Sequence, residues 1–192
     1  GITLYRPSEL IISARAGTPV PEIEAALAEH GQHLIAEPPD TRALFNAAEP
    51  ATLGGIIAAN LSGPRRIAWG AMRDHLLGIR FVNGAGEVLR SGGRVLKNVT
   101  GLDLCKLLAG SYGTLGVITE ITLKVLPAPE ATATLLIEVP DIATGVRALS
   151  AGLGSPFSVT GAALLPGTPT VAALRLEDFA ASVTYRGARL RE

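Results

Sequence analysis

Residues 50–60 read Pro50-Ala51-Thr52-Leu53-Gly54-Gly55-Ile56-Ile57-Ala58-Ala59-Asn60, and residues 110–119 read Gly110-Ser111-Tyr112-Gly113-Thr114-Leu115-Gly116-Val117-Ile118-Thr119. Each stretch joins several glycines to an apolar run and to small hydroxyl residues. Because glycine has no Cβ, its backbone can lie directly against a flat or charged ligand. Two such stretches in one chain indicate a cradle of bare backbone for a ligand.

The first stretch is predicted to form a helix over residues 55–61. Thr52 and the amides of Leu53, Gly54 and Gly55 lie at its start, where they can hold a phosphate or a pyrimidine carbonyl. The same surface is predicted to continue through Asn60, Ser62 and Gly63. A purely structural interpretation also fits these residues, namely a glycine-rich helix start packed against a sheet.

The second stretch is predicted to lead from a glycine turn into a long strand over residues 115–126. Val117 and Ile118 then lie where their backbone can meet the edge of a ligand ring. A tight turn before a buried strand explains the same residues without a ligand. Spacing alone leaves both interpretations open.

Composition excludes several classes of protein. The 17 Lys and Arg residues balance the 17 Asp and Glu residues, so no net charge gathers nucleic acid or an anionic membrane. Only 18% of residues are charged, which favours a surface partly covered by a ligand or partner. Cys105 is the only cysteine, so an internal disulfide is excluded and no metal site is predicted. Without a long apolar run or a signal-peptide pattern, we expect a soluble cytoplasmic protein.

The chain is predicted to be α+β, with domains at residues 1–127 and 128–192 separated near a Pro127-Ala128-Pro129 linker. In the first domain we expect strands at 10–16, 76–82, 87–90 and 115–126, and helices at 19–31, 55–61 and 103–109. Thr18 and Asp103 are the predicted N-caps. The second domain is predicted to run strand, helix, two strands, helix over 131–139, 141–153, 157–164, 170–176 and from 178 onward. That order is most of a ferredoxin-like unit.

Together these motifs resemble the vanillyl-alcohol oxidase or PCMH-type FAD-binding domain family, and within it the E-type subunits of bacterial glycolate oxidases. The resemblance runs in order along nearly the whole chain. Its most specific segments are residues 15–19 (Arg-Ala-Gly-Thr-Pro), 37–40 (Glu-Pro-Pro-Asp), 61–66 (Leu-Ser-Gly-Pro-Arg-Arg) and 96–103 (Leu-Lys-Asn-Val-Thr-Gly-Leu-Asp), with 158–165 and 174–177 in the second domain.

The resemblance implies that the chain binds FAD. The implied contacts are Pro50, Thr52, Leu53, Gly54, Gly55, Asn60, Ser62, Gly63, Gly113, Gly116, Val117 and Ile118. It also implies that the chain begins at the second half of the FAD domain, without the N-terminal phosphate-binding loop, and ends inside the ferredoxin-like cap. We therefore expect this piece to be inactive by itself.

The implied function is that of an FAD-binding subunit of a 2-hydroxy acid oxidoreductase that converts glycolate to glyoxylate. Its expected partners are a sister flavoprotein subunit and an iron–sulfur subunit, with peripheral attachment to the inner membrane through them. The alternative is a non-catalytic assembly module that has the flavoenzyme fold and has lost the cofactor.

No residue is assigned as catalytic. His75 beside Asp74 fits either a general base oriented by a carboxylate or a structural pair. Arg65, Arg66 and Arg73 fit either partners for a substrate carboxylate or flavin phosphate, or solvated loop charges.

Overall fold

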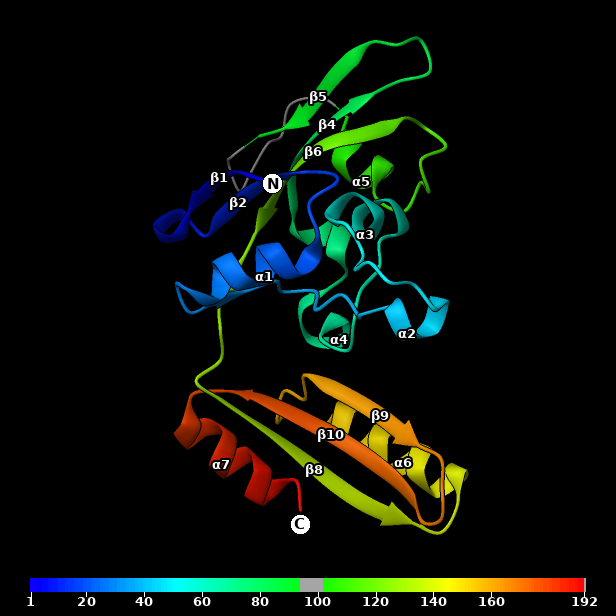
Figure 1. The fold of residues 1–192 in the computed structure, drawn as a ribbon. Helices are drawn as coiled ribbons and strands as arrows, with labels where there is room; N and C mark the ends of the chain where they lie inside the picture. Colours follow the sequence, from blue (N-terminus) through cyan, green and yellow to red (C-terminus); the bar gives the residue numbers. More distant parts are fainter. Residues whose placement is uncertain (94–101, 192) are drawn as a thin grey trace. The chain divides into compact units, whose positions relative to one another are not determined.

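The computed structural model describes residues 1–93 and 102–191, which form two compact units (Figure 1). The first unit contains residues 1–63 and 70–128. The second contains residues 64–69 together with the chain from residue 129 onward. The short segment 64–69 thus packs with the second unit, although it lies within the first predicted domain. Most of the 96–103 motif lies outside the described residues.

The first unit is built on a five-stranded antiparallel sheet with the order β1-β2-β6-β4-β5. The strands are β1 (Ile2–Arg6), β2 (Ile11–Arg15), β4 (Leu76–Val82), β5 (Val88–Gly92) and β6 (Val117–Lys124). Four of them were predicted from the apolar patterns, and the α+β class is confirmed. Strand β1 was not predicted.

Helices cover the apolar face of this sheet. They are α1 (Val20–Ala28), α3 (Leu53–Ala59) and α5 (Leu104–Leu108). The unit also contains the short helix α2 (Arg42–Phe45) and the 3-10 turns η1 (Pro7–Glu9) and η2 (Met72–His75). Ile12, Ile79 and Ile121 lie in the core beneath them, each at most 4% exposed. A two-stranded ribbon of β3 (Gln32–His33) and β7 (Leu126–Pro127) completes the unit.

Two details of the predicted helices are tested by the structure. Pro19, not Thr18, occupies the N-cap of α1, so that prediction was wrong. Thr18 instead uses its backbone carbonyl to accept a hydrogen bond from the amide of Leu53, at 2.8 Å. Asp103 does cap α5, as predicted, by accepting a hydrogen bond from the amide of Lys106.

The second unit is a three-stranded antiparallel sheet with the order β8-β10-β9 (Figure 1). Its elements are α4 (Arg66–Trp69), β8 (Ala131–Val139), α6 (Ile142–Gly154), β9 (Gly161–Leu165), β10 (Thr170–Asp178) and α7 (Ala180–Arg189). The predicted strand-helix-strand-strand-helix order is present from β8 to α7. Gly145 and Gly152 let α6 lie close to the sheet, because a Cβ at either position would collide with Leu164 or Leu174.

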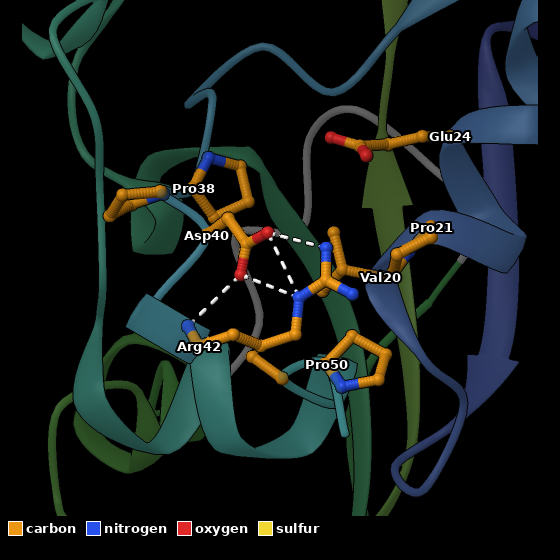
Figure 2. Close-up of a pocket in the computed structure, with 9 residues that line it drawn as sticks. Val20, Pro21, Glu24, Pro38, Asp40, Arg42 and Pro50 are labelled. Atoms are coloured by element: carbon orange, nitrogen blue, oxygen red, sulfur yellow. Dashed lines mark hydrogen bonds and ion pairs between the residues drawn. The ribbon is translucent and has the colours of Figure 1, made fainter. Parts of the chain in front are cut away.

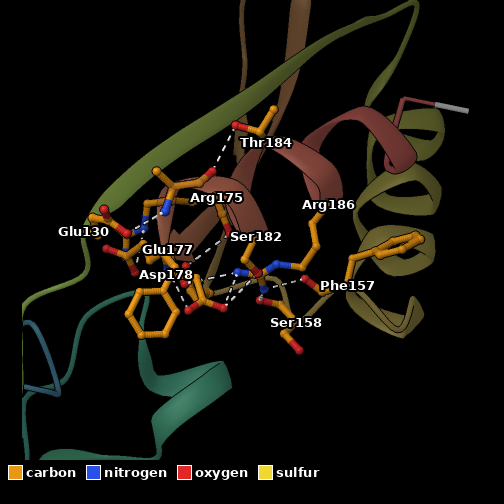
Figure 3. Close-up of polar contacts among 12 residues, drawn as sticks. Glu130, Phe157, Ser158, Arg175, Glu177, Asp178, Ser182, Thr184 and Arg186 are labelled. Carbon is orange, nitrogen blue, oxygen red and sulfur yellow. Dashed lines mark hydrogen bonds and ion pairs between the residues drawn. The ribbon is translucent and has the colours of Figure 1, made fainter.

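Ion pairs order the polar side of this unit (Figure 3). Arg186 of α7 donates to the carbonyl oxygen of Phe157 at 3.0 Å and to the carboxylate of Asp178 at 2.9 Å. Arg65 donates two hydrogen bonds to the carboxylate of Glu177 of β10, from Nε to Oε2 at 3.1 Å and from Nη2 to Oε1 at 2.7 Å. The Arg65 side chain is 14% exposed and that of Glu177 is 6% exposed. This pair therefore anchors the segment 64–69 to the sheet.

We predict that the Arg65–Glu177 pair makes this unit sensitive to acid. Burial raises the pKa of the Glu177 carboxyl, but hydrogen bonds from Arg65 and Thr160 and the nearby positive charges outweigh it and hold the pKa below 4.5. Since the folded pKa is lowered, the stabilisation is complete above the unfolded value and is lost as pH falls through the folded one.

Glu177→Gln should lower the free energy of unfolding by about 2–4 kcal/mol at pH 7 and by much less at pH 3. Urea titrations followed by far-UV circular dichroism measure both values. Glu138→Gln, which changes an exposed glutamate of β8, is the matched control. Equal losses at the two pH values would contradict the assignment.

Candidate functional site

The start of α3 lies against the end of β2. Thr52 is the N-cap, and its Oγ1 accepts a hydrogen bond from the amide of Gly55 at 3.3 Å. The amide of Gly54 donates to the carbonyl of Ala16 at 2.7 Å, and that of Leu53 donates to Thr18. All three amides predicted as ligand donors therefore already have acceptors within the protein.

The predicted glycines fall into two groups. Gly54, Gly63 and Gly116 are needed for internal packing. A Cβ on Gly54 would lie 2.7 Å from the Cβ of Ala16, and one on Gly116 would lie 2.6 Å from the carbonyl oxygen of Val82. On Gly63 it would collide with the backbone of Glu37. At these three positions another part of the chain occupies the space where a Cβ would lie. The absence of the Cβ atoms therefore leaves no room for a ligand there.

Gly55 and Gly113 form the second group. A Cβ at Gly55 would make only an ordinary contact with Thr52, and one at Gly113 would meet no described atom within 4 Å. Gly113 has a φ of +76°, a conformation that favours glycine. Of the predicted glycine contacts, these two leave backbone open to a ligand.

The structure brings the two glycine stretches together at the end of α3. The amide of Gly110 donates to the carbonyl of Ile57 at 3.1 Å, and that of Tyr112 donates to the carbonyl of Ala58 at 2.9 Å. These bonds reach carbonyls in the last turn of the helix, where the regular pattern of helix hydrogen bonds ends. The two glycine stretches thus meet at the end of α3.

Asn60 and Ser62 shape the turn after α3. Asn60 ends the helix in the left-handed conformation, with φ +49°, and its Oδ1 accepts from the amide of Arg73 at 2.9 Å. The hydroxyl of Ser62 donates to the carbonyl of Asn60 and accepts from the amide of Met72. Both predicted site residues therefore hold the loop leading to η2.

The second stretch presents apolar side chains to the outside. Val117 is 67% exposed, Tyr112 is 76% exposed and Leu115 is 47% exposed, whereas Ile118 packs against the core. The Oγ of Ser111 is buried and has no hydrogen-bond partner among the described residues. Sequence reasoning assigned no role to Tyr112 or Ser111. We call the exposed residues Gly55, Tyr112, Gly113, Leu115 and Val117 the open surface.

Pro50 lies elsewhere, in a pocket of about 150 Å³ beside α1 (Figure 2). Its walls are mainly prolines and small apolar residues, namely Val20, Pro21, Pro38, Pro39, Pro50 and Ala51, with Glu24, Asp40 and Arg42. Asp40 accepts hydrogen bonds from Arg42, which lower the pKa of its carboxyl to about 2. This ion pair keeps the charges of Asp40 and Arg42 satisfied over the physiological pH range.

The other candidate residues have internal roles. Arg65 is bound to Glu177. The Oδ2 of Asp74 accepts from the amide of Ala71 at 2.8 Å, so this carboxylate holds the start of η2. Cys105 is 2% exposed, and burial raises the pKa of its thiol, as expected for an inert core residue. Among the described residues, no helix is long and apolar enough to span a membrane.

Comparison with known proteins identifies the first unit. Residues 1–92 match the family described as "FAD binding domain". The match lies in the N-terminal part of the chain. The cofactor of the family is FAD.

Curated relatives extend the match. The chain is 52% identical over 139 residues to the glycolate oxidase subunit GlcE of Escherichia coli, covering 72% of this chain and 38% of the relative. It is 34% identical over 152 residues to the glycolate oxidase subunit GlcD of Bacillus subtilis, covering 73% and 30%. The D-lactate dehydrogenase of Anaerostipes hadrus is 34% identical over 138 residues, with coverage of 72% and 27%. The chain therefore spans well under half the length of these relatives.

A solved structure of alkyldihydroxyacetonephosphate synthase supports the fold. It is 22% identical, has a TM-score of 0.79, and is similar over 100% of this chain and 39% of its own length. This likeness shows that the fold is shared.

The open surface fits the ring of a flavin. Its exposed apolar side chains and open glycine backbone suit a flat ring system. The start of α3 fits a phosphate poorly, because its amides already donate to Ala16, Thr18 and Thr52. The residues present thus suit the apolar part of the cofactor better than its pyrophosphate.

Alanine substitutions at Gly54 and Gly55 should show which of the two glycines is required for packing. Gly54→Ala should lower the free energy of unfolding by about 1–3 kcal/mol, because the new methyl group overlaps Ala16. Gly55→Ala should be neutral or stabilising by up to about 1 kcal/mol, since alanine is the better helix former. Thermal unfolding of both variants measures the difference. If the two melt together, the packing role of Gly54 is wrong.

Proposed function

We propose that this chain is the FAD-binding part of a 2-hydroxy acid oxidoreductase of the glycolate oxidase type. The observation that carries the proposal is the meeting of the two glycine stretches at the end of α3, in a chain whose residues 1–92 match an FAD-binding family. The similarity to glycolate oxidase subunits from two bacteria supports the substrate class.

FAD, when bound, supplies the redox chemistry by accepting a hydride from the hydroxyl-bearing carbon of the acid. The part of this chain is to bind and orient it. Gly55 and Gly113 offer backbone to the ring or its linker, and Leu115 and Val117 offer apolar contact. The internally bonded residues Thr52, Leu53, Gly54, Asn60, Ser62, Gly63 and Gly116 act indirectly, by fixing the shape of the surface.

We further propose that glycolate is the substrate and that electrons pass through the flavin to partner subunits. A sister flavoprotein and an iron–sulfur subunit are the proposed partners. The names of the relatives, which include both a GlcE and a GlcD subunit, support an assembly of several subunits.

Val117→Glu should weaken FAD binding at least about tenfold, a loss near 1.4 kcal/mol, because it places a charge on the open surface. Fluorescence quenching of FAD titrated with the protein measures the dissociation constant. Val146→Glu, on an exposed position of α6, is the matched control and should leave binding unchanged. Equal effects of the two substitutions would remove Val117 from the site.

The function itself is tested by adding FAD, desalting, and recording the visible spectrum before and after glycolate, with and without the partner subunits of a glycolate oxidase. A retained flavin that glycolate bleaches only in the presence of partners is the expected result. A protein that remains colourless would favour the alternative of a non-catalytic assembly module. That alternative has its own observation in the internally bonded amides of α3.

A further inference from the structure

A tight turn lies in the middle of the second glycine stretch. The carbonyl of Ser111 accepts hydrogen bonds from the amide of Thr114 at 3.0 Å and from its hydroxyl at 2.6 Å. The two residues between them both have positive φ angles, +54° at Tyr112 and +76° at Gly113. Positive φ at both central positions is the feature of a type I′ turn, in which glycine, asparagine and aspartate dominate. Tyr112 therefore occupies a position that its residue type disfavours.

The contacts that the structure describes for this turn do not require a tyrosine. In the left-handed conformation the Cβ of an L-residue comes too close to the following carbonyl oxygen, which strains the backbone. The amide of Tyr112 donates to the carbonyl of Ala58 at 2.9 Å, a bond that any residue except proline can make. Its side chain is 76% exposed, so the core does not need its ring. A strained residue that folding does not require indicates a role in binding.

The residues that follow Tyr112 suit a flat ligand. A Cβ on Gly113 would meet no described atom within 4 Å, so a ring can approach this backbone closely. Leu115 and Val117 come next in the same stretch and are 47% and 67% exposed. Aromatic side chains gain stability from stacking on other flat rings, beyond the gain from buried area alone. The turn therefore presents a tyrosine ring next to backbone and apolar side chains that fit an aromatic ligand.

We propose that the ring of Tyr112 stacks on the isoalloxazine ring of FAD and positions it on the open surface, an inference that rests on the proposed function. FAD contains two flat rings, isoalloxazine and adenine. The isoalloxazine ring is the larger and is electron-poor, whereas the phenol ring of tyrosine is electron-rich, so this pair stacks more favourably than tyrosine with adenine. The strain of the turn is then offset by stacking when the cofactor binds.

Tyr112→Asn tests the strain without any cofactor. Because asparagine adopts positive φ more readily than tyrosine, the variant should melt about 1–4 °C higher than the wild type. Tyr185→Asn changes an exposed tyrosine of α7 and is the matched control. It should leave the melting temperature unchanged or lower it, because a helical residue carries no such strain. If Tyr112→Asn melts no higher than the wild type, the turn does not disfavour tyrosine and the proposal is overturned.

Calorimetric titration with FAD tests the stacking. Tyr112→Asn should weaken binding about tenfold, the loss expected when one stacked aromatic ring is removed. Tyr112→Phe keeps the ring and should bind within about twofold of the wild type, and Tyr185→Asn should bind normally. If the wild type binds FAD and Tyr112→Asn binds it equally well, the stacking is wrong and the proposed function stands. A wild type that takes up no FAD contradicts both.

The fluorescence of the bound flavin shows which of the two rings is stacked. A tyrosine in contact with isoalloxazine quenches its fluorescence by donating an electron to the excited ring, whereas phenylalanine is too difficult to oxidise to do so. Tyr112→Phe should therefore bind FAD as the wild type does, but each bound flavin should be brighter. Equal brightness of the two bound flavins would place the tyrosine away from the isoalloxazine ring and overturn the proposal.

Discussion

The close approach of α3 to the end of β2 is the constraint on which the first unit depends. The amide of Gly54 lies 2.7 Å from the carbonyl oxygen of Ala16, a distance that only a residue without Cβ permits here. Ala16 also donates to Thr119 of β6, at 3.0 Å. Ala16 therefore links the helix, the end of β2 and β6 through its carbonyl and its amide. Any side chain at position 54 would have to move all three.

The far end of α3 is fixed in the same way. Its final carbonyls accept from Gly110 and Tyr112, while Asn60 ends the helix and holds Arg73. A helix of seven residues gains little stability from its own hydrogen bonds. Its position is set by these backbone contacts at both ends and by the burial of Leu53, Ile56 and Ile57. These contacts therefore fix how α3 lies against the second stretch.

Much of this fold could be predicted from the sequence because its strands follow simple apolar patterns. Strands β4 and β8 begin and end at the predicted residues, and the Asp103 cap was recognised from its residue type. Thr18 was mistaken for a cap, because the pattern of a hydroxyl before a helix does not reveal that the helix begins one residue later, after Pro19. Strand β1 escaped prediction because its residues show no regular alternation of burial, whereas the equally short edge strand β5 alternates and follows a hairpin turn.

The candidate site was less predictable, since glycine in a sequence does not show which neighbour requires it. Gly54 and Gly55 are adjacent and identical in type. A Cβ on Gly54 would lie 2.7 Å from the Cβ of Ala16, whereas one on Gly55 would make only an ordinary contact with the N-cap residue Thr52. Only the tertiary contacts separate packing from ligand access.

The Leu61-Ser62-Gly63-Pro64-Arg65-Arg66 motif illustrates the same point for a longer segment. The chain leaves the first unit after Gly63 and returns at Gly70. Both glycines are required by their surroundings: a Cβ on Gly63 would collide with Glu37, and Gly70 has a φ of +87°. Between them, Arg65 binds Glu177 in the second unit. Gly63 and Arg65, which the sequence offered as ligand contacts, thus lie where the segment 64–69 joins the second unit. A motif of this kind can therefore serve the packing of the chain, without any of its atoms contacting a ligand.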